Sequence, residues 1–102
     1  MLTFIECDNT TLLNQIGVPN LLAISGGKVF RRNTGITLPV GEGYSVSIDL
    51  DASDTYCVRR ILNQDGKAII KGQVSNVYCE EIGEVAYKAS CFVNVPFGED
   101  SL

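Results

Sequence analysis

A stretch of strict alternation from Tyr44 to Leu50 constrains the fold more than any other feature of the sequence. Apolar side chains occupy every second position, and the positions between them carry Ser45, Ser47 and Asp49. Successive side chains of a strand point to opposite faces of its sheet, so this pattern predicts a strand buried on one face and wet on the other. Such one-sided strands are typical of antiparallel sheets.

Further strands are expected before this segment. Short apolar runs predict strands at 21–24 and 29–32, and the Gly26-Gly27 pair between them is typical of a tight hairpin turn. Residues 36–40 predict another strand, which ends at Pro39 or lies at a sheet edge, because proline has no N–H to donate. Residues 8–17 leave two interpretations open, a short helix or an irregular loop.

Two more strands are expected after the alternating segment. Residues 55–62 carry Tyr56 and Val58 on one face, and Arg60 interrupts that apolar face near its end. The turn-forming sequence Asn63-Gln64-Asp65-Gly66 predicts a hairpin that returns as a strand at 67–71. We expect Gly72 to end this strand.

The C-terminal part of the chain changes to a helical period. Apolar side chains recur at spacings of three and four residues at Tyr78, Ile82, Val85, Ala89 and Phe92. This spacing places them on one stripe of a helix, for which Ser75 or Asn76 is the predicted capping residue. Residues 95–102 are expected to fray. The sequence therefore predicts an α+β fold, an antiparallel meander of about five strands covered by a C-terminal helix, as a single domain over residues 1–102.

Composition narrows the class of protein. The 102 residues are 45% apolar and 20% charged, which is typical of a folded globular domain. The formal net charge of −4 disfavours unspecific attraction to phosphate backbones or to anionic membranes. No apolar run has the length of a signal peptide or a membrane span, so we expect a cytoplasmic protein without a membrane partner.

The residues for common catalytic chemistry are scarce. The chain has no histidine, which is the most frequent general acid-base residue and metal ligand. Its four cysteines lack the close pairs of a zinc site, and we expect them to be reduced and mostly buried. Cys79 is the one candidate nucleophile, but Glu80 and Glu81 beside it oppose thiolate formation. Asp49 and Asp51 are interpreted as solvated surface carboxylates. We therefore predict no enzyme activity, no catalytic residue, no cofactor and no metal.

A positive cluster is the strongest candidate for a binding site. Arg59 and Arg60 lie in one predicted strand, and Lys67 and Lys71 flank the next. Across the hairpin between them these side chains would form a basic ribbon able to contact nucleic acid or a protein partner. The alternative interpretation is that the charges keep a strand edge soluble and protect it from aggregation.

Two phrases of the sequence resemble small uncharacterised proteins encoded by phages of actinobacteria. They are Asp54-Thr55-Tyr56-Cys57-Val58-Arg59-Arg60-Ile61 and the segment from Val77 to Phe92, VYCEEIGEVAYKASCF. The resemblance implies a phage accessory protein that works in the host cytoplasm or in the virion. It implies no catalytic residue.

Taken together, these features predict a small non-enzymatic protein-interaction or structural module. Its partner would be a host protein or a second copy of the chain, since a free sheet edge or face can accept either. The alternative is a nucleic-acid-binding domain that uses the ribbon of Arg59, Arg60, Lys67 and Lys71.

Overall fold

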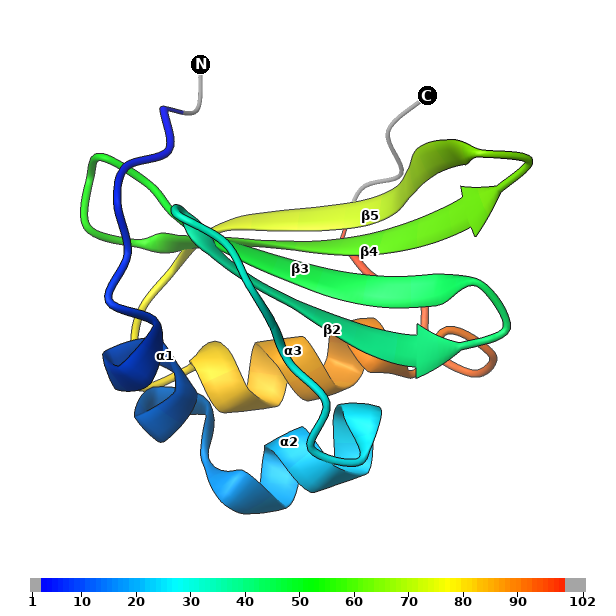
Figure 1. Cartoon of the computed structure of the whole chain (residues 1–102), viewed down its shortest axis with the longest axis horizontal. Helices are drawn as coiled ribbons and strands as arrows, with labels where there is room; N and C mark the ends of the chain where they lie inside the picture. The colour runs from blue at the N-terminus through cyan, green and yellow to red at the C-terminus, as the bar shows by residue number, and fades with distance from the viewer. Residues whose placement is uncertain (1–2, 99–102) are drawn as a thin grey trace.

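One five-stranded antiparallel sheet organises the chain, and three helices cover one of its faces (Figure 1). The computed structural model describes residues 3–98. The strands follow one another across the sheet in chain order: β1 (Phe30–Arg31), β2 (Gly35–Gly41), β3 (Tyr44–Leu50), β4 (Tyr56–Gln64) and β5 (Lys67–Val77). The helices are α1 (Asn9–Ile16), α2 (Val18–Ser25) and α3 (Ile82–Ser90). The predicted α+β class, antiparallel sheet and C-terminal helix are thus confirmed.

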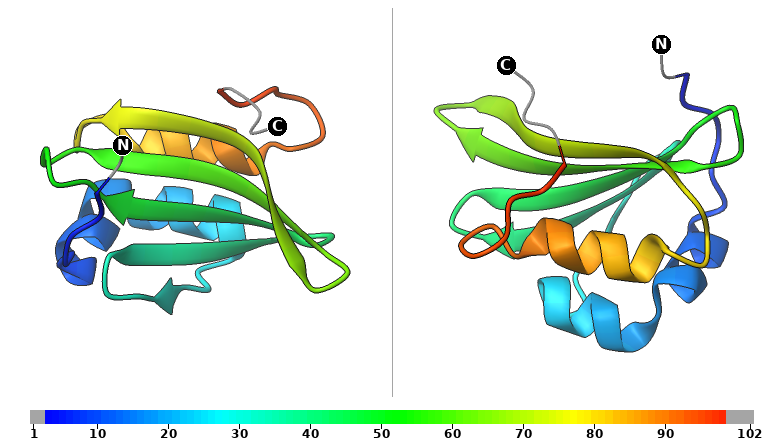
Figure 2. Two further views of the ribbon diagram at one scale, coloured as in Figure 1. Left: turned by 90° about the horizontal axis from the view of Figure 1, so that it is seen from above. Right: turned by 180° about the vertical axis from the view of Figure 1, so that it is seen from behind.

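Figure 2 shows from two further sides that the helices lie on one face of the sheet. The hydrophobic core packs between these two layers. Alternate residues of β2, β3 and β4 face this core, which confirms the strand predicted at residues 44–50. The prediction that its second face is wet was wrong, because Ser45, Ser47 and Asp49 are also buried and hydrogen-bond partners from neighbouring segments lie over that face. The largest fully buried side chains come from both layers: Leu12, Ile36, Leu38, Val46, Ile48, Val58 and Ile82. Burial of this apolar surface is the main force that holds the two layers together.

Gly83 allows α3 to approach the first two helices closely. A Cβ atom at this position would lie 2.6 Å from Asn20 Nδ2 and 2.7 Å from the Ile16 carbonyl oxygen. The glycine is therefore a packing residue, although glycine inside a helix costs about 1 kcal/mol relative to alanine.

The segment predicted as a strand at 21–24 is a helix, and this prediction was wrong. Pro19 stands in the first turn of α2, where its missing N–H costs nothing and its fixed φ suits a helix. Gly26 has the left-handed φ of 64° and closes the helix by donating its N–H to the carbonyls of Leu21 and Leu22. The glycine pair is thus a helix end, and the predicted hairpin is absent.

The open question at residues 8–17 is resolved in favour of a helix. Asp8 is the N-cap of α1, and its carboxylate accepts hydrogen bonds from the backbone N–H groups of Thr10 and Thr11. Gly17 ends the helix with a φ of 89°.

The C-terminal helix begins later than predicted. β5 continues through Gly72 to Val77, so Ser75 and Asn76 belong to the strand and cap no helix. α3 starts at Ile82, and Tyr78 lies in the link before it with 57% of its surface exposed. The stripe predicted from Tyr78 to Phe92 is therefore correct only for Ile82, Val85 and Ala89.

The chain after α3 returns to the sheet. Phe97 is only 5% exposed and belongs to the core, so the prediction that residues 95–98 fray was wrong. Residues 99–102 lie outside the described part of the chain. No helix within residues 3–98 has the length and apolar character needed to cross a membrane.

Candidate functional site

The structure separates the four basic residues that the sequence grouped into one ribbon. Arg60 is 5% exposed and points toward the helices. Its Nε atom donates to the Ala89 carbonyl at 2.7 Å, and its Nη2 atom donates to the carbonyls of Lys88 and Val95. The guanidinium also lies 5.5 Å from the centre of the Phe97 ring. Arg60 therefore joins the end of α3 to the C-terminal segment and is not part of a surface ribbon.

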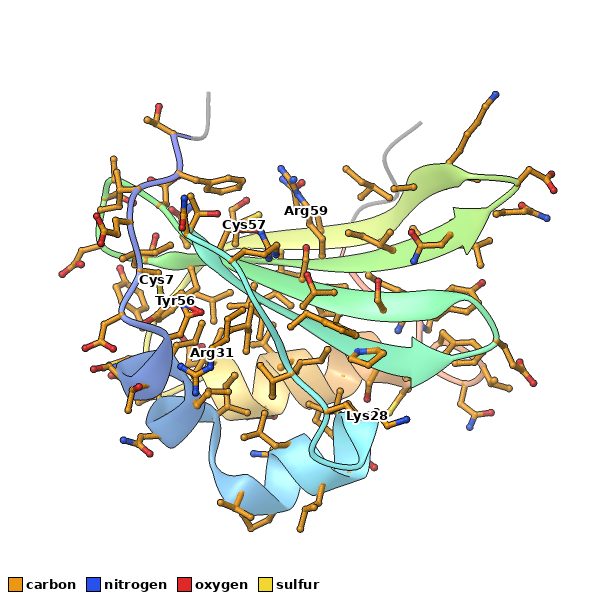
Figure 3. The ribbon with its side chains drawn as sticks, in the orientation of Figure 1. Cys7, Lys28, Arg31, Tyr56, Cys57 and Arg59 are labelled. Atoms are coloured by element: carbon orange, nitrogen blue, oxygen red, sulfur yellow. The ribbon has the colours of Figure 1, made fainter. Side chains whose placement is uncertain are left out.

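Arg59 lies on the other face of the sheet, away from the helices (Figure 3). Its Nε atom donates to Gln73 Oε1 at 2.8 Å, and its guanidinium lies 5.2 Å from the centre of the Phe4 ring. Neighbouring residues of a strand point to opposite faces, which is why Arg59 and Arg60 cannot act on the same surface.

Lys67 and Lys71 are the two members of the set that lie exposed on β5. Neither lysine forms an ion pair with an acid of residues 3–98. The segment between them is Ala68-Ile69-Ile70, in which Ala68 and Ile69 are exposed and Ile70 is half-buried. We call residues 67–71 the open edge, since β5 is an outer strand and, within residues 3–98, pairs only with β4.

The geometry of the β4–β5 hairpin determines which N–H and C=O groups of the open edge form no hydrogen bond with β4. Asp65 and Gly66 both have positive φ, 54° and 75°, as a two-residue type I′ turn requires. Gln64 and Lys67 close this turn and face each other as a pair. Bonded and non-bonded pairs alternate in an antiparallel ladder, so Ala68 and Ile70 direct their N–H and C=O groups away from β4.

The C-terminal segment lies against residues 72–74 of β5. A Cβ atom on Gly72 would overlap the Phe97 carbonyl oxygen, and one on Gly98 would overlap the Gln73 carbonyl oxygen. This close approach of two backbones explains both glycines. It also covers the middle of the β5 edge, whereas the half near the hairpin projects outward in Figure 1.

The opposite edge of the sheet is closed by a polar cluster around Arg32. Arg32 Nη1 bonds Asp49 Oδ1 at 2.6 Å, Nε donates to Thr37 Oγ1, and Nη2 donates to the Ile36 carbonyl. Thr34 Oγ1 donates to the same carboxylate. Asp49 is only 4% exposed, so its interpretation as a solvated surface carboxylate was wrong.

The cysteines show no sign of an activated thiol. Burial is the main reason that the pKa values of Cys7 and Cys57 are raised. Cys79 is exposed and lies in the link before α3, outside the helix. Its Sγ atom donates to Glu80 Oε2 at 3.1 Å, and this hydrogen bond raises the thiol pKa. A nucleophile needs the opposite shift.

Within residues 3–98, no three side chains of the metal-binding types come together to hold an ion. Comparison with protein families, with curated proteins and with solved structures finds no match to this chain. The resemblance to actinobacterial phage proteins therefore stays a prediction.

Proposed function

We propose that this chain is a non-enzymatic protein-interaction module, which binds an extended acidic segment of a partner protein along the open edge. The observation that carries the proposal is the outer half of β5, where two outward N–H groups and two outward C=O groups lie between exposed lysines. An added strand would satisfy these groups through main-chain hydrogen bonds, which is a general mode of peptide recognition.

The side chains of the open edge favour a partner strand of particular chemistry. Ile69 is 38% exposed and offers apolar surface in the middle of the edge. Lys67 and Lys71 place positive charge at its two ends without an acid of residues 3–98 to balance them. Opposite charges facing each other across two strands stabilise the pairing, so acidic side chains at both ends of an apolar centre complement this edge.

A second copy of the same edge fits less well. If two β5 strands paired antiparallel about Ile69, Lys67 of each copy would face Lys71 of the other. Like charges directly opposite each other destabilise a strand pair, and edge lysines are a common protection against self-pairing. A different protein is therefore the partner that the charges favour.

The nucleic-acid alternative loses support from the separation of the four basic residues. Arg60 is buried against carbonyl groups, and Arg59 is held by Gln73 on the face away from the helices. Two lysines remain at the open edge, which is a small positive patch on a chain of net charge −4.

The test is a titration of the labelled protein with capped peptides, followed through backbone amide chemical shifts. The probe peptide alternates valine and threonine and carries a glutamate at each end; its control carries lysines instead. We expect saturable shifts at residues 67–71 with the acidic peptide and none with the basic one. Absence of shifts with the acidic peptide would contradict the proposal.

A matched pair of variants separates strand addition from simple charge attraction. Ala68→Pro removes an outward N–H group and leaves the bonds to β4 in place, because proline is tolerated where its nitrogen faces away from the ladder. Ala68→Val keeps the N–H group. We expect the first variant to abolish peptide binding and the second to keep it; equal binding by both would exclude strand addition.

Two parallel measurements assign the edge to another occupant if the proposal is wrong. Sedimentation that shows a dimer, dissociated by Ala68→Pro, would make a second copy the occupant. Shifts at residues 67–71 caused by duplex DNA at low salt, but not by the acidic peptide, would favour nucleic acid.

A further inference from the structure

A pocket of about 290 Å³ lies at the end of the sheet opposite the β4–β5 hairpin. Its wall is built from the N-terminal segment, α1, the end of β3, the turn before β4 and the link between β5 and α3. The residues that matter most for its chemistry are Asp8, Gln15, Leu50, Asp54, Tyr56 and Tyr78. A pocket of this volume suits a small molecule or one protruding side chain.

The charged groups in the wall are all acidic. Asp8 and Asp54 line the pocket, and no lysine or arginine does. Hydrogen bonds from Thr11 hold the pKa of Asp8 below its usual value, so this carboxylate is negative at neutral pH. Arg31 lies close enough to contribute to that shift but does not line the pocket.

Two aromatic residues complete the wall. Tyr56 is almost fully buried, and its hydroxyl group donates to Gln15 Oε1 at 2.8 Å, so the phenol oxygen keeps its lone pairs as an acceptor. Tyr78 lies largely exposed at the pocket. The faces of aromatic rings attract cations, and this attraction grows when the site excludes water.

The pKa shifts of the neighbouring groups show which side chains of the wall carry charge. Burial, followed by the effect of Cys7, Cys79 and the two carboxylates, raises the pKa of Tyr56 to about 12. Cys7 and Tyr56 lie on the same side of the molecule, above α1 (Figure 3). The pKa of the Cys7 thiol is raised by burial and then by the nearby carboxylates. Both thiols that line the pocket are therefore uncharged at neutral pH, and its charge comes from the carboxylates.

We infer that this pocket binds an organic cation, an alkylammonium or guanidinium group held between the carboxylates of Asp8 and Asp54 and the rings of Tyr56 and Tyr78. Leu50 supplies apolar surface for the alkyl part of such a ligand. The same chemistry is offered by a free amine and by a lysine or arginine side chain of a protein. This pocket lies away from the open edge, and the inference does not depend on the function proposed for that edge.

The first test compares small probes of similar size and different charge. n-Butylammonium and n-butylguanidinium are titrated against the labelled protein at low salt, with neutral 1-pentanol as the control. We expect saturable amide shifts in the lining residues with the two cations, which weaken as salt is added. No saturable shift with either cation, or equal shifts with the neutral alcohol, would overturn the inference.

A matched pair of charge variants tests the role of the pocket carboxylate. Asp54 and Asp65 both have the left-handed φ, 69° and 54°, which asparagine tolerates well, so Asp→Asn preserves the backbone at each site. Asp54→Asn removes a pocket charge, whereas Asp65→Asn removes the same charge at the distant hairpin. We expect the first variant to weaken cation binding by about tenfold, as for loss of a charged hydrogen bond, and the second to leave it unchanged. Equal effects would overturn the inference.

A third arm distinguishes the two sources of the cation. A capped tripeptide with a central lysine is compared with n-butylammonium on the wild-type protein. Tighter binding of the tripeptide assigns the pocket to a side chain of a partner protein, and tighter binding of the free amine assigns it to a small molecule.

Discussion

The two edges of the sheet differ in how much strand backbone the described residues leave open. At the β1 edge, the outer strand is only two residues long, and the partly exposed Arg32 beside it bonds the buried Asp49. At the β5 edge, the C-terminal segment held by Arg60 lies against residues 72–74 and, as far as Gly98, leaves residues 67–71 uncovered. An unpaired strand edge can pair with other chains. We therefore expect a partner to bind at residues 67–71, which neither Arg32 nor Arg60 helps to cover.

The largest expected effect is the loss of the clamp at the β5 edge. Arg60→Met removes the hydrogen bonds to the carbonyls of Lys88, Ala89 and Val95 and should lower the free energy of unfolding by roughly 3–5 kcal/mol. Urea denaturation measures the change. Arg60→Lys keeps the positive charge but lacks the planar guanidinium with its several donors. Its free energy of unfolding should therefore lie between those of the wild type and Arg60→Met. A loss below about 1 kcal/mol in Arg60→Met would show that the clamp is dispensable.

A glycine at the β1 edge should tolerate change poorly. A Cβ atom on Gly35 would overlap the carbonyl oxygen of Ile48 in the central strand β3. This backbone is fixed by pairing on both sides, so Gly35→Ala should destabilise the fold by about 3 kcal/mol, near the upper end for overpacking. Thermal unfolding followed by circular dichroism tests the prediction. An unchanged melting temperature would contradict the prediction, because it would mean that the backbone near Gly35 can shift to accommodate a Cβ atom.

The cluster at the β1 edge should contribute less than Arg60. Arg32→Met leaves the buried carboxylate of Asp49 with Thr34 as its remaining partner. Removing one member of a buried pair costs 3–5 kcal/mol in general, but the Arg32 side chain is 37% exposed, so we expect about 2 kcal/mol. The double variant Arg32→Met/Asp49→Asn should recover part of this loss in urea denaturation. If the double variant is less stable than Arg32→Met, the account of this cluster is wrong.

The smallest expected effect is at the covered half of β5. Gly72→Ala places a Cβ atom against the Phe97 carbonyl, but the opposing backbone, unlike that of β3, is not fixed by strand pairing on both sides. We expect a loss of about 1 kcal/mol, in contrast to Gly35→Ala. The amides of residues 73 and 74 should exchange faster with solvent, and the shifts caused by the acidic peptide should extend to them. Unchanged exchange there would contradict the covering role of the C-terminal segment.

The sequence carried enough information to predict the central strands and part of the site. Alternation placed residues 44–50 correctly, and it put Arg60 on the same face as Val58, where the structure finds it buried. The partners of Arg60 are carbonyls at the end of α3 and beyond, which come together only through tertiary structure. A basic ribbon was therefore predicted where the chain instead has a buried clamp.

Two predictions of secondary structure were wrong for identifiable physical reasons. The apolar run at 21–24 is too short for its period to separate a strand from a helix, although Pro19 before it is a typical helix-start residue. Tyr78 matched the helical spacing of Ile82 by coincidence, because strand pairing with β4 extends β5 to Val77. Such pairing depends on residues distant in sequence, which local patterns do not record.

Amide hydrogen exchange of the protein bound to the acidic peptide tests the central claim most directly. Strand addition at the open edge predicts new protection at Ala68 and Ile70, whose N–H groups point away from β4, and little change at Ile69, which is already paired within the hairpin. Phe30 and Arg31 at the other edge should not change. Binding without new protection at Ala68 and Ile70 would contradict the account.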